Sequence, residues 1–300
     1  MIRPIGQPIG KGMRFARFAH EGAVRIGIVD EAGGSVRRLE PAVGDLLDLI
    51  RGYDELKHRL QGSGDALRLS DVTLLAPIPA PPRNIFCVGK NYREHAREFA
   101  RSGYEAGAVK GAEIDAHPAV FTKPASSIVG HGATVDLHPE ATAKVDYEVE
   151  LAVVIGREGR NIRREDAYAH VWGYTIINDV TARDRQQRHK QWFLGKALDT
   201  FCPMGPWVTT SDEVDPENLD LHCWVNGELR QSANTRDLIF DIPTLIATIS
   251  EGMTLVPGDI ISTGTPAGVG IGMDPPTFLK PGDTVSMSIS GLGTLTNSFA

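Results

Sequence analysis

The feature that most limits the possible folds of this chain is a series of short apolar segments, each bounded by glycine or proline, that begins at residue 84 and continues to the C-terminus. Segments of this length, rich in β-branched and aromatic residues, are typical of β-strands. The Asn226-Gly227 pair in WVNGEL is a strong signal for a two-residue hairpin turn. Few helical patterns interrupt the series, so the sequence predicts a largely β domain.

The N-terminal quarter of the chain has a different pattern. RFARFAHEGAVRIGIVDEAGGSVRRL predicts two strands, and VGDLLDLIRGYDELKHRLQG has the periodicity of a helix. The four prolines of LLAPIPAPPRN predict a stiff, extended linker. We therefore expect an α+β protein with a small α+β domain at residues 1–76 and a largely β catalytic domain at 77–300.

Composition excludes several classes of function. The chain has 300 residues and a net charge of −7, and it has no basic stripe, so we expect no nucleic-acid partner. It has no apolar run of bilayer length and no signal-peptide core, so we expect no membrane partner and a cytoplasmic location. Its three widely spaced cysteines form no CxxC pair and are expected to be inert. The residues before Met13 resemble a loose extension, and the alternative is an upstream start.

Residues 146–154, DYEVELAVV, place two acids inside an apolar strand. Because side chains alternate along a strand, Glu148 and Glu150 point the same way. Two buried carboxylates side by side need a positive partner, and a divalent cation would supply it. The alternative is a solvent-facing side of an antiparallel sheet, where charged residues are common.

A third carboxylate, Asp179, ends the apolar segment GYTIIND, at a point where a strand turns into a loop. Three carboxylates without histidine or cysteine favour Mg²⁺ or Mn²⁺ over Zn²⁺. Spacing alone does not bring Asp179 next to the two glutamates.

Several motifs, in order, resemble the fumarylacetoacetate hydrolase family: FCVGKNYREHARE, VFTKPASSIVG, DYEVELAVVIG, GYTIINDVTARDRQ, GKALDTFCPMGPWV and GDIISTGTPAGVG. The resemblance implies a mixed β-sandwich or β-roll, usually preceded by a small α+β domain. It implies that Glu148, Glu150 and Asp179 bind one Mg²⁺ or Mn²⁺, and that the protein is a homodimer. Members of this family cleave, hydrate, isomerise or decarboxylate small keto acids.

The segment NYREHAREF places His95 and Glu98 three residues apart on one helical face, where they can touch. With the resemblance, we interpret the pair as a water-activating dyad on a lid, for which Gly103 and Gly107 would be hinges. The alternative is a charged surface helix. The long stretch at 101–117 would reshape the pocket.

Four further residues are expected to contact substrate, as the resemblance implies. Arg183 and Gln186 would hold its carboxylate and oxygens, and Lys196 would lie near the metal and the substrate oxyanion. Thr265, in the glycine-rich turn STGTPAGVG, would donate a hydrogen bond to a carboxylate. For Arg183 and Gln186, the alternative is an exposed polar helix face. For Lys196, it is a side chain whose ammonium stays in water. For Thr265, it is a tight turn that needs glycine only for its backbone angles. Lys123 and Ser126 are weaker candidates for the pocket wall.

Three functions are compatible with these residues. The first is a metal-dependent hydrolase that cleaves the C–C bond of a small 1,3-diketo acid, such as an acylpyruvate or fumarylpyruvate. The second is an isomerase, hydratase or decarboxylase of a related 2-oxo acid, such as 2-hydroxyhepta-2,4-diene-1,7-dioate or oxaloacetate, with the same metal site. The third is a metal-binding relative without catalysis, against which the complete set of site residues argues. We expect the hydrolase, with a small keto acid as substrate.

Overall fold

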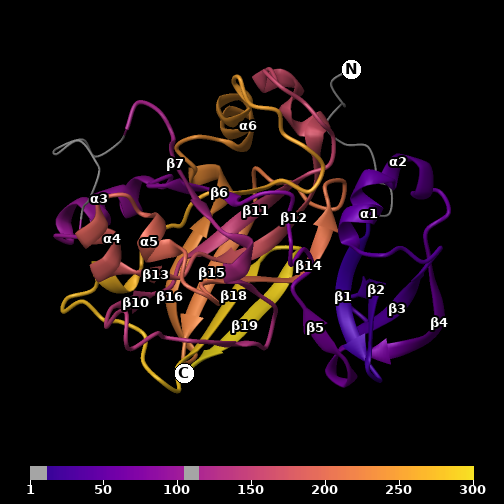
Figure 1. Cartoon of the computed structure of the whole chain (residues 1–300), viewed down its shortest axis with the longest axis horizontal. Helices are drawn as coiled ribbons and strands as arrows, with labels where there is room; N and C mark the ends of the chain where they lie inside the picture. Colours follow the sequence, from indigo (N-terminus) through magenta and orange to yellow (C-terminus); the bar gives the residue numbers. More distant parts are fainter. Residues whose placement is uncertain (1–11, 105–114) are drawn as a thin grey trace.

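The computed structural model describes residues 12–104 and 115–300. Most of its regular structure is β, with a few short helices, so the predicted fold class is confirmed (Figure 1). The α-helices are α1 (Leu46–Arg51), α2 (Tyr53–Leu56), α3 (Arg93–Arg101), α4 (Arg183–His189), α5 (Phe193–Lys196) and α6 (Ile242–Ser250). Short 3₁₀ helices lie at Leu69–Asp71, Ala125–Ser127, Arg164–His170, Thr235–Asp237 and Gly270–Gly272.

A twelve-stranded sheet runs through the molecule. Its order is β4 (Gln61–Arg68), β3 (Ser35–Glu40), β2 (Ala23–Asp30), β1 (Arg14–His20), β14 (Cys202–Thr210), β12 (Val171–Asn178), β11 (Val149–Ile155), β17 (Ile260–Ser262), β6 (Ile85–Gly89) and β7 (Ala119–Lys123). Two short strands lie beside this path: β5 (Thr73–Leu75) pairs with β1, and β8 (Ile128–Val129) pairs with β14. The central strands β11, β12 and β14 are buried along their whole length.

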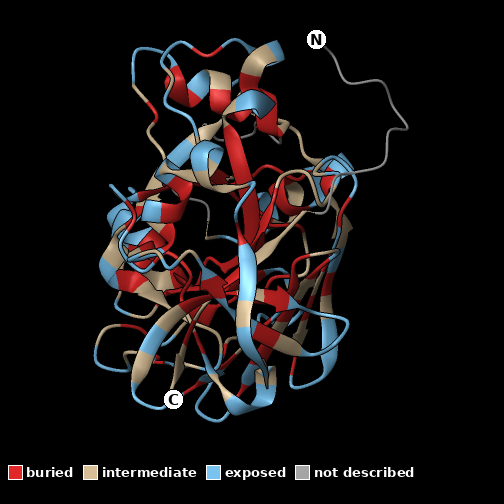
Figure 2. Cartoon of the chain, turned by 90° about the vertical axis from the view of Figure 1, so that its right-hand side faces the viewer, coloured by how far each residue is buried: buried red, intermediate tan, exposed pale blue. Residues whose placement is uncertain are grey.

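A second sheet faces the first and completes a sandwich. Its order is β16 (Glu228–Asn234), β15 (Asp220–Val225), β18 (Thr284–Ile289), β19 (Gly293–Phe299) and β9 (Thr134–Val135). Side chains of β15 and β18 alternate between buried and more exposed, as expected for strands with one face on a core. Leu221, Met287 and Leu295 of this sheet share one apolar cluster with Val149 and Leu151 of β11. The buried residues accordingly gather in the middle of the molecule (Figure 2).

The N-terminal strands extend the large sheet, because β1 pairs with β14. The helix predicted for this region is instead two short helices, since α1 ends at Arg51 and α2 begins at Tyr53, with Gly52 between them. Of the predicted linker at 74–84, Leu74 and Leu75 end β5, and residues 76–84 contain neither helix nor strand. The domain division at residue 76 stays a prediction.

None of the helices in the described ranges has the length and apolar character needed to cross a bilayer. Cys87, Cys202 and Cys223 are buried and unpaired. Burial raises the pKa of Cys202 to about 12, which keeps this thiol protonated and unreactive.

Candidate metal and active site

The pairing of β11 with β12 brings the three predicted metal ligands together. The two strands are antiparallel with Val149 opposite Asn178, so the start of one lies beside the end of the other. The Asp179 N–H donates to the Glu148 carbonyl oxygen at 2.9 Å. One oxygen from each of Glu148, Glu150 and Asp179 lies within 4.8 Å of the others, and all three residues are buried. The solvent-facing alternative for the two glutamates is therefore wrong.

Alternation along β11 separates the acids from the sandwich core. Val149 and Leu151 pack between the sheets, whereas Glu150 shares the other face with Ala152, which packs in a second apolar cluster. Glu150 Oε2 accepts hydrogen bonds from Ser262 Oγ at 2.5 Å and from Gly264 N at 3.0 Å. These donors lie at and after the end of β17, the strand next to β11.

Buried cations surround the carboxylates. Lys196 Nζ lies 2.6 Å from both Glu148 Oε2 and Asp179 Oδ2. Arg183 pairs with Glu148 Oε1 at 2.6 Å through its terminal nitrogen, and with Asp146 Oδ2 at 2.9 Å through Nε. Since Lys196 and Arg183 are 2% and 1% exposed, the predicted alternatives that left their charges in water are wrong.

The pKa values of Glu148 and Glu150 shift in opposite directions. Burial alone would raise the pKa of Glu148, but Lys196 and Arg183 outweigh burial and lower it. At Glu150, burial and then the charges of Asp179 and Glu148 raise the pKa well above the usual range. No cationic group in the described ranges forms an ion pair with Glu150, since the cations around it pair with its neighbours instead.

A divalent cation is the group that these residues fit. Burial, and then the charges of Asp179 and Glu148, favour the neutral form of Glu150, and the positive charge of a metal ion would oppose these effects. The donors are all carboxylate oxygens, which suits Mg²⁺ or Mn²⁺ rather than a softer metal. Glu148, Glu150 and Asp179 would hold the ion.

The predicted dyad forms on α3. His95 Nδ1 lies 3.1 Å from Glu98 Oε2, and His95 is 4% exposed, so the surface-helix alternative is wrong for this histidine. Glu98 Oε1 accepts a hydrogen bond from Gly268 N at 3.0 Å. Phe99, on the same helix, packs with Val269 and Ile271. The helix is thereby fixed to the glycine-rich turn that follows β17.

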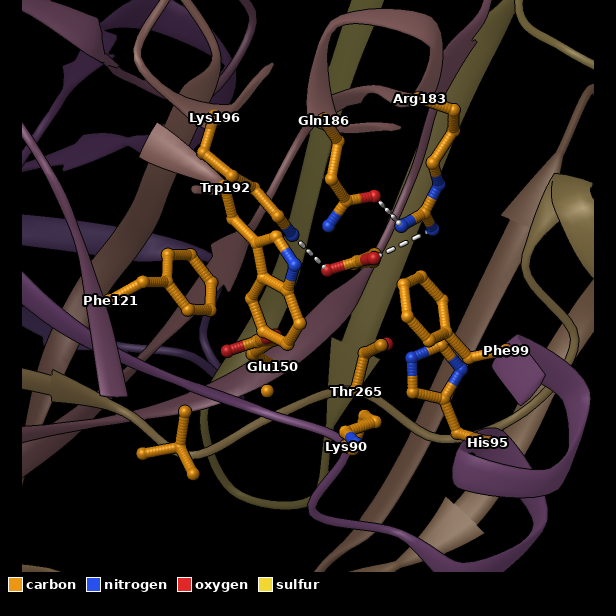
Figure 3. A pocket seen from close by; sticks show the side chains of 13 residues that line it. Lys90, His95, Phe99, Phe121, Glu150, Arg183, Gln186, Trp192, Lys196 and Thr265 are labelled. Carbon is orange, nitrogen blue, oxygen red and sulfur yellow. Dashed lines mark hydrogen bonds and ion pairs between the residues drawn. The ribbon is translucent and has the colours of Figure 1, made fainter. Parts of the chain in front are cut away.

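A small pocket lies over the carboxylates (Figure 3). Seven of the nine predicted site residues line it: His95, Glu148, Glu150, Arg183, Gln186, Lys196 and Thr265. The other two, Glu98 and Asp179, each contact a residue of the lining. The helices α3, α4 and α5, which carry five of the nine predicted residues, gather at one side of the molecule (Figure 1).

Two predicted contact residues have hydrogen bonds that fix their orientation. Thr265 Oγ1 accepts from Gln231 Nε2 at 2.8 Å, which leaves the hydroxyl proton available for another acceptor. Gln186 Oε1 accepts from Arg183 at 3.2 Å. The guanidinium of Arg183 thus contacts two carboxylates and an amide, and its predicted contact with substrate stays a prediction.

The two weaker wall candidates are wrong. Lys123 is fully buried behind the pocket, with Nζ 2.7 Å from Asp179 Oδ1, and Ser126 is exposed. Of the predicted lid stretch at 101–117, residues 105–114 lie outside the described residues, and so does the proposed hinge Gly107.

Sequence reasoning missed six residues of the pocket wall: Val88, Gly89, Lys90, Phe99, Phe121 and Trp192. Lys90 lies inside the motif FCVGKNYREHARE, shortly before His95 and Glu98. This position in a motif of the family was the one signal in the sequence that could have identified it. Nothing in the local sequence distinguishes Phe121 or Trp192 from ordinary core residues.

Two protein-family models match most of the chain. A family model described as fumarylacetoacetate (FAA) hydrolase C-terminal matches residues 84–300, and one described as Rv2993c-like, N-terminal matches residues 13–77. The chain is 56% identical over 230 residues to the oxaloacetate tautomerase YisK of Bacillus subtilis (strain 168), which covers 76% of this chain and 73% of the relative.

Two solved structures are also similar. A fumarylacetoacetate hydrolase from the psychrophile Exiguobacterium antarcticum superposes with a TM-score of 0.80 at 44% identity, covering 96% of this chain and 99% of that one. A maleylpyruvate hydrolase from Sphingobium sp. SYK-6, in complex with manganese(II) and pyruvate, superposes with a TM-score of 0.75 at 35% identity and the same coverage.

Proposed function

Because this chain belongs to the fumarylacetoacetate hydrolase family, we propose that it is a metal-dependent tautomerase that interconverts the enol and keto forms of a small 2-oxo acid of the oxaloacetate type. The observation that carries the proposal is the buried Glu148, Glu150 and Asp179 set beneath a pocket lined by His95. The relative named an oxaloacetate tautomerase supports this choice over the hydrolase that we expected from the sequence.

Tautomerisation requires a Lewis acid and a group that moves a proton. A divalent cation at the carboxylate set would polarise the 2-oxo group and acidify the adjacent C–H. Glu98 accepts from His95 Nδ1, which leaves Nε2 as the nitrogen that exchanges a proton with the substrate carbon. Lys196 keeps its charge because Asp179 and Glu148 raise its pKa against the effect of burial. Its ammonium would stabilise negative charge on the substrate oxygen.

Hydrolysis of a 1,3-diketo acid is the second candidate, and the contact between His95 and Glu98 favours it, because the same dyad can activate water. The similarity to a maleylpyruvate hydrolase also supports it. Hydrolysis differs from tautomerisation in needing a water molecule to reach the distal carbonyl carbon. The two candidates are therefore distinguished by their products.

The test follows two reactions of the purified protein with Mg²⁺ or Mn²⁺. We expect faster conversion of enol-oxaloacetate to the keto form, measured by ultraviolet absorbance, and no pyruvate or acetate from acetylpyruvate by proton NMR. Glu150→Gln should lower the rate at least about 100-fold, comparable to loss of a key electrostatic group. Glu55→Gln, on the exposed α2, is the matched control.

Cleavage of acetylpyruvate without faster ketonisation would replace this proposal with the hydrolase. Absence of both reactions with either metal would overturn the metal-centred mechanism.

A further inference from the structure

Lys90 is a buried cation that faces the same pocket as the carboxylate set. It follows β6, its side chain is 5% exposed, and it lines the pocket with Glu150 and Thr265. Figure 3 shows it beside Thr265, on the opposite side of the pocket from Lys196. Lysine is almost never buried to this degree without a partner.

The only ion pair of Lys90 in the described part of the chain is with Asp115. Its Nζ lies 2.7 Å from Asp115 Oδ2, but the nitrogen makes no well-aligned hydrogen bond there. The Asp115 side chain is 26% exposed. A carboxylate partner that reaches solvent can exchange for another carboxylate at little cost in desolvation.

The other two cations of the pocket wall are engaged differently. Lys196 bridges Glu148 and Asp179, and Arg183 bridges Glu148 and Asp146, in contacts that are buried on both sides. Breaking such a buried pair leaves an uncompensated charge and is strongly unfavourable. Lys90 is therefore the cation of this wall that is best able to accept a carboxylate from a ligand.

The backbone around Lys90 is held in place. Lys90 has φ 53°, a left-handed conformation that is uncommon for a residue with a side chain and that clusters at functional sites. The next residue, Asn91, is fully buried, and its amide nitrogen donates to the carbonyl oxygens of Phe240 and Thr263. Its amide oxygen accepts from Phe240 N at 2.7 Å. The lysine is therefore presented from a rigid segment.

A 2-oxo dicarboxylate has a second carboxylate, which needs a cationic side chain as its partner in the pocket. Its first carboxylate and its 2-oxo oxygen are the pair that a cation on the glutamates would bind. The second carboxylate is then carried into the rest of the pocket, where leaving it unpaired would be costly. Asp115 shows that a carboxylate fits on Lys90 at 2.7 Å.

We propose that Lys90 binds the distal carboxylate of the substrate and selects 2-oxo dicarboxylates over 2-oxo monocarboxylates, with Asp115 as an internal stand-in that the substrate displaces. This assignment rests on the proposed function, because it requires that a metal-chelating 2-oxo acid occupies the pocket. It names the substrate class that the metal site alone leaves open.

The test measures binding rather than turnover. Malate and lactate are compared by calorimetry on the Mg²⁺-loaded protein, since both carry a 2-oxygen and a first carboxylate but only malate has the distal one. Lys90→Met should weaken malate binding about 10–100-fold, in the range of a hydrogen bond to a charged group, and change lactate binding less than about 2-fold. Asp115→Asn should tighten malate binding, because it removes the competing charge.

Two further variants control for folding and for charge. Lys90→Arg should keep most of the preference for malate over lactate. Lys57→Met, which removes a lysine from an exposed ion pair, should leave the affinity for both ligands unchanged. If Lys90→Met does not fold, Lys90→Gln provides the same comparison. Equal losses for malate and lactate, or no loss for either, would overturn the assignment.

The two proposals fail separately. If oxaloacetate is not tautomerised but the preference for malate depends on Lys90, only the proposed reaction is wrong. If oxaloacetate is tautomerised and Lys90→Met leaves kcat/KM for it unchanged, only the role of Lys90 is wrong.

Discussion

Glu98 keeps its place because the residue facing it has no side chain. A Cβ atom on Gly272 would lie 1.8 Å from Glu98 Oε1 and 2.1 Å from its Cδ, far inside van der Waals contact. Those atoms belong to the end of a flexible side chain, so Glu98 can move away without disturbing the backbone. It would then lose its contacts with His95 Nδ1 and Gly268 N.

Gly272→Ala should therefore disable the dyad and leave the rest of the site intact. We expect kcat for ketonisation to fall about 10–100-fold, because His95 loses the carboxylate that orients it. Metal affinity, measured by calorimetry, should stay within about 2-fold of wild type. Gly52→Ala is the control, since its Cβ would lie 3.3 Å from Leu56 Cδ1, a close contact that the end of this flexible side chain can relieve by a small shift. A variant with full activity would show that Glu98 does not need its present position.

Residue types at this site could be predicted from the sequence, but their pairings could not. A buried acid inside an apolar strand must have a positive partner, which made Glu148 and Glu150 candidates, but the sequence left a solvent-facing side of the strand open as the alternative. Which cation meets which acid depends on contacts between distant parts of the chain. Arg183 was expected to contact substrate, and the structure shows it contacting Glu148 and Asp146. Lys90 was not singled out, because its left-handed backbone and its burial are not visible in sequence.

Lys123 connects three elements behind the carboxylate set. It ends β7, and its ammonium contacts the carbonyl oxygen of Val180 after β12 and that of Lys196 at the end of α5. It also pairs with Asp179 Oδ1 at 2.7 Å, with both side chains fully buried. One side chain thus fixes the position of a metal ligand and of the helix that carries Lys196.

Lys123→Met should destabilise the fold strongly. The change leaves the Asp179 carboxylate short of a buried counter-charge, which costs about 3–5 kcal/mol when one partner of a buried pair is removed. Denaturant unfolding without metal measures the loss, and Lys57→Met, in an exposed ion pair, should lose less than about 1 kcal/mol. Because a divalent cation would replace part of the missing charge, Mg²⁺ should stabilise the variant more than the wild type. A loss below about 1 kcal/mol for Lys123→Met would contradict this account.

At the scale of elements, the existence of a strand was easier to predict than which strands pair with each other or where a helix ends. β11 and β12 were recognisable from their apolar, β-branched composition. Their antiparallel register, which brings Asp179 to the glutamates, is a long-range pairing that local sequence does not specify. The single helix expected near residue 50 is two helices, because glycine at position 52 allows the chain to leave the first helix there.

For the whole molecule, the sandwich follows from the alternation of buried and exposed residues in β15 and β18 and from the fully buried central strands. The continuation of the large sheet into the N-terminal strands through β1 and β14 was not predictable, since it joins residues almost two hundred positions apart. We propose that the protein is a homodimer, as the family resemblance implies. Light scattering should then give a mass of about 65 kDa, twice the 32.5 kDa of one chain, and a mass of one chain would refute it.

Metal binding should stabilise the fold, because Glu150 lies in β11, Glu148 directly precedes β11 and Asp179 directly follows β12. At a concentration of about 100 times its Kd, a bound ion stabilises the native state by about 2.7 kcal/mol, which corresponds to a rise in Tm of roughly 5 °C for a chain of this size. Thermal unfolding with Mg²⁺ and with a chelator measures this difference, and Ca²⁺-free buffer with added KCl controls for ionic strength.

Glu150→Gln provides the decisive comparison, because its effect on the stability of the fold should have opposite signs without and with bound metal. Without metal, the variant should be at least as stable as the wild type, since it removes a buried carboxylate whose pKa is raised by burial and by Asp179 and Glu148. With Mg²⁺, the wild type should become the more stable protein, because the variant has lost a ligand. If Glu150→Gln is less stable than the wild type in the chelator, then Glu150 has a cationic partner within the protein itself, and the shortage of positive charge that points to a metal does not exist.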